Sequence, residues 1–271
     1  MCGICGVVNF DRRPVEAGLV ERMTKLLAHR GPDSEGVHRD ADQGLALGAT
    51  RLAILDIERG RQPMLGADGA VCIVHNGEIY NHAELRRGLE AEGRRLRTTG
   101  DTEVVLELYL RHGPDFAGHL RGMFATAIWD GRERRLVLAR DALGIKPLFY
   151  RLDEEGIAFG SELKALVALP SFTGEPSVQA LHAFLSHNSI PAPQTIYREA
   201  LKLSPGHVLC CRDGEVRIVC YSRPAPVPRG QLRRESEREL AGELRERLRD
   251  SLRAHLVSDV PVGVMLSGGV D

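Results

Sequence analysis

Cys2 is the residue whose type and position most directly suggest chemistry in this chain. A protonated thiol is a weak nucleophile, with an intrinsic pKa of about 8.5. If Met1 is removed, which is usual ahead of a small residue, Cys2 also carries a free α-amine that titrates near ~7.8. That amine can accept the thiol proton and later protonate a leaving amine, so one residue supplies nucleophile and base. The alternative is a frayed terminus without a function.

The run Cys2-Gly3-Ile4-Cys5 is also a C-x-x-C pair, a pattern typical of redox or metal sites. A redox pair opens a helix after a strand, whereas this pair precedes the strand-like residues 7–10. A zinc site needs four ligands, and the remaining cysteines, at 72, 210, 211 and 220, lack the required spacing. We therefore expect no metal in this region, and we interpret Cys5 as a small buried hydrophobe.

Composition excludes several classes of protein. The 271 residues are 43% hydrophobic and 27% charged with a net charge of −1, which is typical of a globular protein and gives no basic field for nucleic acid. No apolar run approaches the ~18 residues that span a membrane, and residues 1–13 lack a signal-peptide layout. Six cysteines in a chain of this size do not make a disulfide scaffold, so we expect a cytoplasmic protein.

Short strands and amphipathic helices alternate irregularly, which favours an α+β fold over a doubly wound one. Apolar runs predict strands at 4–10, 45–50, 52–55, 70–74, 125–129, 135–139, 148–151 and 156–160. Helical periodicity predicts helices at 15–29, 82–92, 101–111 and 178–187.

The C-terminal part has a different pattern. A proline-rich connector at 224–228 precedes leucines that recur every four residues from Leu240 to Leu256, which predicts an amphipathic helix. Residues 260–266 have the pattern of a buried strand that runs into Ser267-Gly268-Gly269. One helix and one strand cannot form a domain alone, so we expect the chain to be a truncated product or a fragment.

Further motifs accompany Cys2 in a fixed order. They are MCGI (1–4), HRGPD (29–33), RLAI (51–54), HNGEIYN (75–81), GDTE (100–103), GMFA (122–125), RDALGIKPL (140–148), SELKAL (161–166), PAPQTI (191–196) and LSPG (203–206). Together they resemble the class II glutamine amidotransferase domain, an N-terminal-nucleophile hydrolase. SDVPVG (258–263) and LSGGVD (266–271) resemble the start of the synthetase domain of glutamine-hydrolysing asparagine synthetases.

The resemblance implies a four-layer αββα sandwich for residues 2–200. It implies a linker or strand pair at 201–230, followed at 231–271 by the start of an α/β PP-loop ATP pyrophosphatase domain.

For glutamine binding, the resemblance places Arg51 on the carboxylate, where a planar guanidinium can bind both oxygens, and Asp101 on the ammonium group. Glu78 would bind the ammonium group too or orient the loop. The structural alternatives are a surface arginine beside a strand for Arg51 and a helix N-cap for Asp101.

For catalysis, the resemblance makes the side-chain amide of Asn76 and the backbone N–H of Gly77 the oxyanion hole of the Cys2 reaction. The structural alternative is a plain hairpin turn, since Asn-Gly is a common turn pair. His29, Arg30 and Asp33 are expected to support the site without a catalytic role.

Consecutive glycines after a strand can cradle a pyrophosphate with their backbone N–H groups. By resemblance, Leu266, Ser267, Gly268, Gly269 and Asp271 belong to an incomplete ATP-binding PP-loop.

The expected function is hydrolysis of L-glutamine to glutamate and ammonia through a Cys2 thioester, a step that needs no cofactor. In the intact enzyme, ammonia would amidate aspartate to asparagine with ATP and Mg²⁺, and the full-length protein is expected to be a homodimer. One alternative is an asparagine-synthetase-like amidotransferase with another carboxylate acceptor. Another is a catalytically silent interaction or regulatory module, which retention of Met1 would favour.

Overall fold

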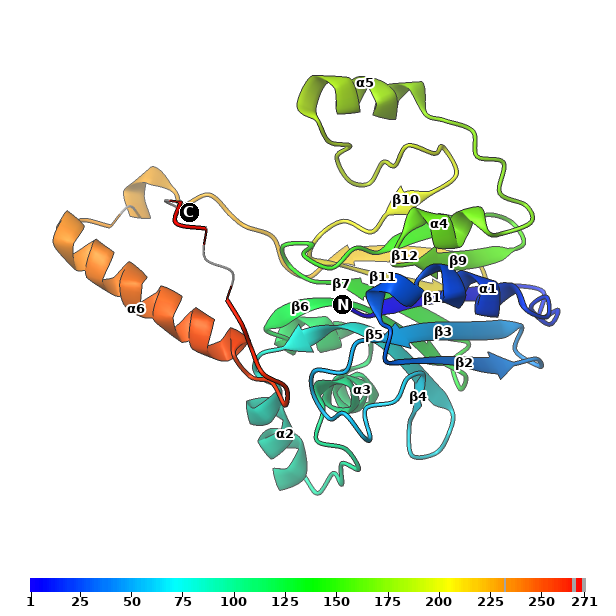
Figure 1. Cartoon of the computed structure of the whole chain (residues 1–271), viewed down its shortest axis with the longest axis horizontal. Helices are drawn as coiled ribbons and strands as arrows, with labels where there is room; N and C mark the ends of the chain where they lie inside the picture. Colours follow the sequence, from blue (N-terminus) through cyan, green and yellow to red (C-terminus); the bar gives the residue numbers. More distant parts are fainter. Residues whose placement is uncertain (232, 265–266, 270–271) are drawn as a thin grey trace.

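The computed structural model describes residues 1–231, 233–264 and 267–269, and its body contains two antiparallel sheets of six strands (Figure 1). In spatial order, the first sheet consists of β10 (Leu201–Lys202), β8 (Phe149–Leu152), β9 (Gly156–Gly160), β1 (Gly3–Asn9), β3 (Leu45–Arg51) and β2 (Ser34–Asp40). The second consists of β12 (Glu215–Cys220), β11 (His207–Arg212), β7 (Arg135–Arg140), β6 (Gly122–Asp130), β5 (Val71–Ile79) and β4 (Met64–Leu65).

Alternation along the strands buries both faces of each sheet, because successive side chains point to opposite sides. In β1, Ile4 and Val8 belong to the hydrophobic core between the sheets, where they share a cluster with Val74 of β5. Cys5 and Val7 belong to a second cluster on the outer face of the first sheet. The sheets therefore pack face to face, and each also has an apolar outer face.

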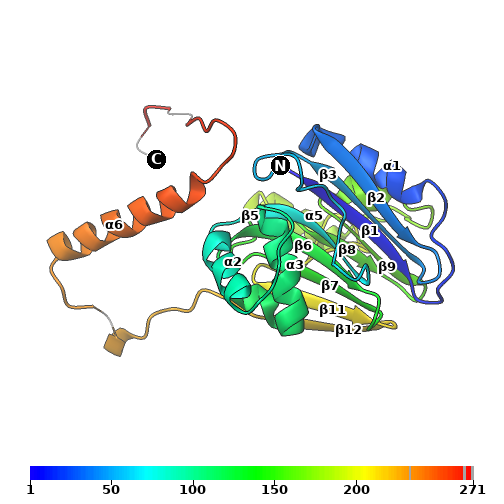
Figure 2. The same cartoon turned by 90° about the horizontal axis from the view of Figure 1, so that it is seen from below.

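Helices cover these outer faces (Figure 2). The first sheet is covered by α1 (Leu19–Leu26) and α4 (Leu163–Val167), and the second by α2 (His82–Ala91) and α3 (Asp101–His112). Short 3₁₀ helices are η1 (Ala28–Arg30), η2 (Gly113–His119) and η3 (Arg229–Gln231). The layers follow the order αββα, which confirms the predicted fold class.

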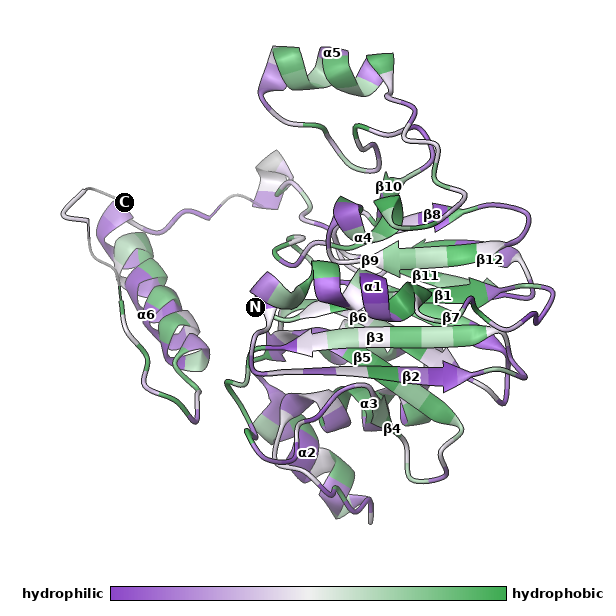
Figure 3. Cartoon of the chain, turned by 45° about the vertical axis from the view of Figure 1, so that its right-hand side comes forward, coloured by the Kyte–Doolittle hydropathy of each residue, from purple (hydrophilic) through white to green (hydrophobic). Residues whose placement is uncertain are grey.

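Two helices, α5 (Val178–His187) and α6 (Glu237–His255), stand apart from the body (Figure 1). Apolar and polar residues alternate along α6 in Figure 3, and none of its residues is buried. It begins at a capping box, in which Ser236 accepts the Glu239 N–H and the Glu239 carboxylate accepts the Ser236 N–H. No helix among the described residues is both long enough and apolar enough to cross a membrane.

Some predicted elements are wrong. Residues 52–55 form a loop instead of a strand, because the chain turns back so that the Leu55 carbonyl accepts an N–H of the Arg51 side chain. The predicted buried strand at 260–266 is absent over 260–264, where Val262 and Val264 are exposed and no sheet strand lies alongside; residues 265–266 lie outside the described part. Strand β2 was not predicted, since an edge strand with the sequence SEGVHRD has little apolar alternation.

Candidate active site

Cys2 directly precedes β1, which lies inside the first sheet between β9 and β3. Two sets of hydrogen bonds hold the backbone of Cys2 and of the first residues of β1. Arg30 donates from Nε to the Cys2 carbonyl at 2.9 Å and from Nη1 to Glu162 at 2.9 Å. The Ile4 N–H donates to Ser161 Oγ at 3.0 Å, and the Ser161 N–H donates back to the Ile4 carbonyl at 2.9 Å. The predicted supporting residue Arg30 is thus in contact with the nucleophile itself.

The Cys2 thiol faces the carbonyl of Leu52, with Sγ 3.8 Å from the oxygen. Burial raises the pKa of this thiol above its ordinary value, so it holds its proton at neutral pH and needs a base to become a nucleophile. Burial also lowers the pKa of the amine at the adjacent N-terminus, which favours the neutral form that accepts a proton.

Asn76 and Gly77 lie inside β5, paired with Ala125 and Phe124 of β6, so the hairpin-turn alternative is wrong. The Asn76 side chain is 1% exposed, and no described residue lies within hydrogen-bond distance of its Nδ2 or Oδ1. A buried amide without a partner costs about 1–3 kcal/mol, so such a group calls for an explanation. A Cβ at Gly77 would lie 2.5 Å from the Met123 carbonyl oxygen, and this close approach requires glycine.

Arg51 ends β3 and is buried, so it is not the surface arginine of the alternative interpretation. Its guanidinium donates to three loop carbonyls, those of Leu55 and Asp56 at 2.7 Å and of Ile57 at 3.0 Å. These bonds use three of the five N–H groups and leave two. Arg51 therefore organises the loop that follows it and still has donors for an anion.

Asp101 is the first residue of α3, but it does not cap that helix; Gly100 occupies the N-cap position. Its Oδ2 accepts the N–H of Ile79 at 2.9 Å, which ties α3 to the end of β5. His75 Nε2 lies 3.9 Å from the same oxygen. Burial lowers the pKa of His75, so the ring is neutral, and its Nδ1 lies 2.7 Å from Thr126 Oγ1.

Glu78 is partly buried at the same site. Burial, followed by the negative charge of Asp101, raises its pKa to about 8, while Lys146 and Arg51 act in the opposite direction. Lys146 was not predicted as a site residue, although the chain has only four lysines and this one lies in the RDALGIKPL motif. It is buried because Asp141 accepts the N–H groups of Ile145 and Lys146 at 3.0 Å and so folds the loop inward.

One cavity brings together five of the six predicted glutamine-site residues: Cys2, Arg51, Gly77, Glu78 and Asp101. Asn76 directly precedes Gly77. The free volume is about 30 Å³. At the ~10–15 Å³ that each water requires, this is room for two or three waters.

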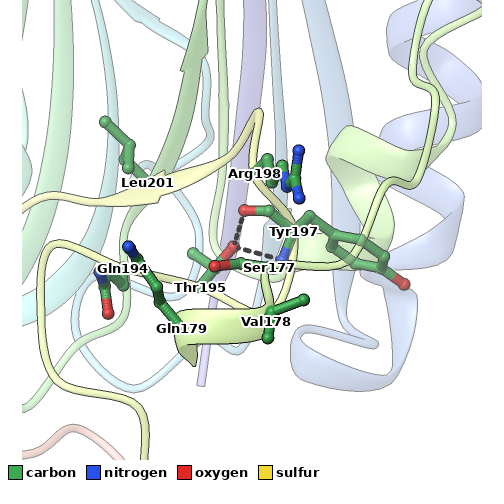
Figure 4. Close-up of a pocket in the computed structure, with 8 residues that line it drawn as sticks. All are labelled: Ser177, Val178, Gln179, Gln194, Thr195, Tyr197, Arg198 and Leu201. Atoms are coloured by element: carbon green, nitrogen blue, oxygen red, sulfur yellow. Dashed lines mark hydrogen bonds between the residues drawn. The ribbon is translucent and has the colours of Figure 1, made fainter. Parts of the chain in front are cut away.

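A cavity of about 480 Å³ lies elsewhere, between the start of α5 and residues 194–201 (Figure 4). Its hydroxyl groups serve local structure. Thr195 Oγ1 lies 2.8 Å from the Ala200 carbonyl and accepts the Tyr197 N–H at 3.1 Å, and Ser177 Oγ caps α5. We place the active site at the smaller cavity, because only that cavity contains a nucleophile beside opposite charges.

Of the predicted PP-loop residues, the structure describes Ser267, Gly268 and Gly269. Gly269 donates its N–H to Ser267 Oγ at 3.2 Å, and Gly268 has φ +72°, a left-handed conformation that favours glycine. Leu266 and Asp271 lie outside the described residues. Within the described ranges, no cluster of three potential metal-ligating side chains occurs.

A sequence model for the "Glutamine amidotransferase domain" matches residues 1–222. The chain belongs to this family. A second model, for asparagine synthase, matches residues 243–271 of the chain, in agreement with the predicted start of a synthetase domain.

Curated relatives match the whole chain. Asparagine synthetases [glutamine-hydrolyzing] 1 and 3 of Bacillus subtilis are 38% and 36% identical over 100% of this chain. The amidase chry2 of Gibberella zeae is 32% identical, also over 100%. The chain spans 42%, 44% and 41% of these relatives, less than half of their length.

A solved structure supports the fold alone. Glutamine phosphoribosylpyrophosphate amidotransferase from B. subtilis aligns with a TM-score of 0.60 at 19% identity, over 82% of this chain and 49% of that one.

Proposed function

We propose that this chain hydrolyses L-glutamine to glutamate and ammonia, with Cys2 as the nucleophile. The observation that carries the proposal is the buried, unpartnered amide of Asn76, next to a cavity that contains Cys2, Arg51 and Asp101. A tetrahedral oxyanion would give that amide its missing partner.

Recognition follows from the charges of the cavity. The two remaining N–H donors of Arg51 would bind the glutamine carboxylate, and Asp101 would bind the ammonium group. Charge-assisted bonds of this kind contribute roughly 1.5–3 kcal/mol each. Opposite charges at two ends of a small cavity select an amino-acid zwitterion.

The reaction begins when the α-amine of Cys2, freed by removal of Met1, takes the thiol proton. The sulfur attacks the glutamine side-chain carbonyl, and the oxyanion accepts hydrogen bonds from the Asn76 amide and the Gly77 N–H. The C–N bond then breaks as the protonated α-amine of Cys2 gives its proton to the leaving nitrogen. Ammonia departs, and the glutamyl group stays bound to Cys2 as a thioester. Water, activated by the same amine, hydrolyses the thioester to glutamate.

Glutamine needs more space than the few waters that the cavity can hold. The side of the cavity most suited to opening is the loop 52–62, which has no strand pairing and is held by side-chain hydrogen bonds of Arg51, of Asp56 and, at its end, of Gln62 with the His75 backbone. We propose that this loop opens to admit glutamine and closes over it.

For the whole protein, we propose an ATP-dependent synthetase that uses the ammonia to amidate a carboxylate. The B. subtilis relatives, named asparagine synthetases, support aspartate as the acceptor; the alternative is another carboxylate. ATP would be bound at Ser267–Gly269 and the residues next to them, with Mg²⁺ on its phosphates. The division at residues 200 and 230 stays a prediction.

The test is glutamine-dependent ammonia release by the purified chain, with the N-terminal mass measured to verify removal of Met1. Cys2→Ala should abolish release, and Asn76→Ala should lower kcat about 10²–10³-fold, the loss typical of an oxyanion-hole donor. Cys220→Ala, which removes an exposed cysteine on β12, is the matched control and should keep full activity. Lack of activity in a folded protein without Met1 would contradict the proposal and favour the silent module.

A further inference from the structure

The segment that follows α6, residues 256–264, returns to the body and contacts the loop 52–62 at the candidate active site. The Asp56 N–H donates to Asp259 Oδ2 at 2.7 Å, and the Asp259 N–H donates to the Ile54 carbonyl at 3.0 Å. The two residues are separated by 203 positions in the sequence. One aspartate thus holds the loop with both its side chain and its backbone.

Asp56, the loop residue in this contact, makes several further hydrogen bonds. The Asp56 carboxylate accepts the N–H groups of Thr99 at 2.7 Å, Gly100 at 3.2 Å and Arg59 at 3.1 Å, and these bonds lower its pKa. Its carbonyl accepts one N–H from Arg51 at 2.7 Å. Asp56 is 8% exposed and has φ +48°, a left-handed conformation that a non-glycine residue adopts only when its surroundings hold it there.

Asp56 therefore connects both supports of the proposed glutamine site. Through its carbonyl it contacts Arg51, and through its carboxylate it fixes the residues directly before Asp101. The only other polar group on the backbone of Asp56 is its N–H, and Asp259 accepts that hydrogen bond. Loss of this acceptor leaves a nearly buried N–H without a partner, which is a costly state.

The end of α6 and the segment after it also contact the body through rings and apolar side chains. The His255 ring lies on the Tyr80 ring, with centroids 4.0 Å apart. A cavity of about 200 Å³ beside them is lined by Ile54, Glu78 and Tyr80 from the body and by Val257 and Val262 from the segment. Glu78 also lines the Cys2 cavity, so the segment lies directly behind the candidate active site.

We propose that Asp259 is a positioning residue for the glutamine site: it holds Asp56 in the conformation that sets Arg51 and Asp101 at the correct separation for glutamine. This inference rests on the proposed function. It assigns to the segment after α6 a part in glutamine binding, although the described residues of that segment make no hydrogen bond to a predicted substrate-binding side chain.

The test compares two reagents for the Cys2 thiol, on the chain freed of Met1, by mass spectrometry of the proteolytic peptide that contains Cys2, because iodoacetamide also reacts with other accessible thiols such as that of Cys220. 6-Diazo-5-oxo-L-norleucine has the carboxylate and ammonium groups of glutamine, and it alkylates the thiol with loss of N₂. Iodoacetamide alkylates the same thiol without needing the Arg51 and Asp101 contacts. The ratio of the two labelling rates therefore measures recognition separately from reactivity.

Asp259→Ala should lower the rate for the glutamine analogue by about tenfold, the equivalent of one hydrogen bond, while the iodoacetamide rate changes less than twofold. Asp259→Asn retains an oxygen acceptor and should stay within about threefold of the unmodified chain. Asp250→Asn is the matched control, because it removes a carboxylate from an exposed ion pair on α6 and should change neither rate.

The outcomes are distinguishable. If the unmodified chain reacts with iodoacetamide at Cys2 but not with the glutamine analogue, the proposed function fails. If the analogue labels the unmodified chain and Asp259→Ala equally fast, the proposed function stands and the role of Asp259 fails. If Asp259→Ala changes both rates by the same factor, Asp259 supports the fold near Cys2 without positioning the glutamine contacts, which also overturns the inference.

Discussion

Strand β1 buries six of its seven residues, whereas α6 buries none of its nineteen. The environment of β1 comes from distant parts of the chain: β3 pairs on one side and β9, about 150 residues later, on the other. Most interactions of α6 are local: a capping box and ion pairs three or four residues apart, such as Arg247–Glu243 and Arg253–Asp250. Its contact with the body is at its C-terminal end, where the His255 ring lies against that of Tyr80.

The difference shows where each region's stability originates. Tertiary packing holds β1 and therefore the backbone of the nucleophile that precedes it. Exposed ion pairs contribute only ~0.3–0.5 kcal/mol each, so α6 is held weakly. Along its length, Leu244, Leu248 and Leu252 form an apolar stripe that no described residue covers. Four predictions test this comparison.

The largest expected difference is between two large apolar side chains. Phe159 of β9 is 0% exposed between the sheets, whereas Leu248 of α6 is 56% exposed. Phe159→Ala should lower the free energy of unfolding by about 3–5 kcal/mol, and Leu248→Ala should change it by less than about 0.5 kcal/mol. Denaturant unfolding followed by the fluorescence of Trp129, the single tryptophan, reports on the body. Equal losses would break the comparison.

Glycine-to-alanine substitutions should have opposite signs in the two regions. A Cβ at Gly6 would lie 2.6 Å from the Phe159 ring and 2.7 Å from Leu47, so Gly6→Ala should destabilise the body by about 1–3 kcal/mol. A Cβ at Gly242 in α6 meets no described atom, so Gly242→Ala should stabilise the helix by about 0.5–1 kcal/mol. Trp129 fluorescence measures the first effect and far-ultraviolet circular dichroism the second. A stabilising Gly6→Ala would show that the core has spare room.

A pH series tests the electrostatics of the site. The pKa of Glu78 is raised from 4.5 to about 8, so the folded state binds more protons than the unfolded state between these pH values. Stability should therefore fall as pH rises through this window. Glu78→Gln should remove this dependence and raise the free energy of unfolding at pH 8 by roughly 1–2 kcal/mol.

The matched control for Glu78→Gln is Glu237→Gln, which removes an exposed carboxylate at the start of α6. Its pH profile should follow that of the unmodified chain. A Glu78→Gln profile that also follows the unmodified chain would mean that Glu78 is solvated in solution and does not share the buried site.

The smallest effect is expected at the cap of α6. Ser236→Ala removes the side chain that accepts the Glu239 N–H, which costs about 1 kcal/mol of helix stability. Circular dichroism should show a modest loss of helix on warming, while the Trp129 unfolding transition stays unchanged. A shift of the Trp129 transition would mean that α6 and the body unfold as one unit.

The sequence was informative wherever local rules determine structure. Helix α5 has the predicted bounds, and α6 contains the leucine repeat that predicted it, because side-chain periodicity decides both. Prediction was wrong where distant partners decide. Asn76 and Gly77 have the local pattern of a turn, but pairing with β6 keeps them extended. Residues 52–55 have a strand pattern, but the buried Arg51 guanidinium draws their backbone into a loop.

The candidate site divides in the same way. Motifs indicated Cys2, Arg51, Glu78 and Asp101, and the structure places them around one cavity. The roles of Asp56 and Lys146 could not be predicted, because each depends on how a loop folds back on residues far away in the sequence. The bond from Asp56 to Asp259 connects the body to the C-terminal segment. Asp259 lies in the SDVPVG motif, but that motif indicates the start of the synthetase domain and not a contact with the body.

The pairing of β1 with β9 also sets an order of events during synthesis. Ser161, which brackets Ile4 with two hydrogen bonds, is made roughly 10–30 s after Cys2 at ordinary ribosome speeds. Throughout that interval β1 lacks one of its neighbours, and the first residues are open to the enzymes that trim new chains. The interval is long enough for Met1 to be removed before the surroundings of Cys2 are complete, so the buried position of the mature N-terminus is no obstacle to its trimming.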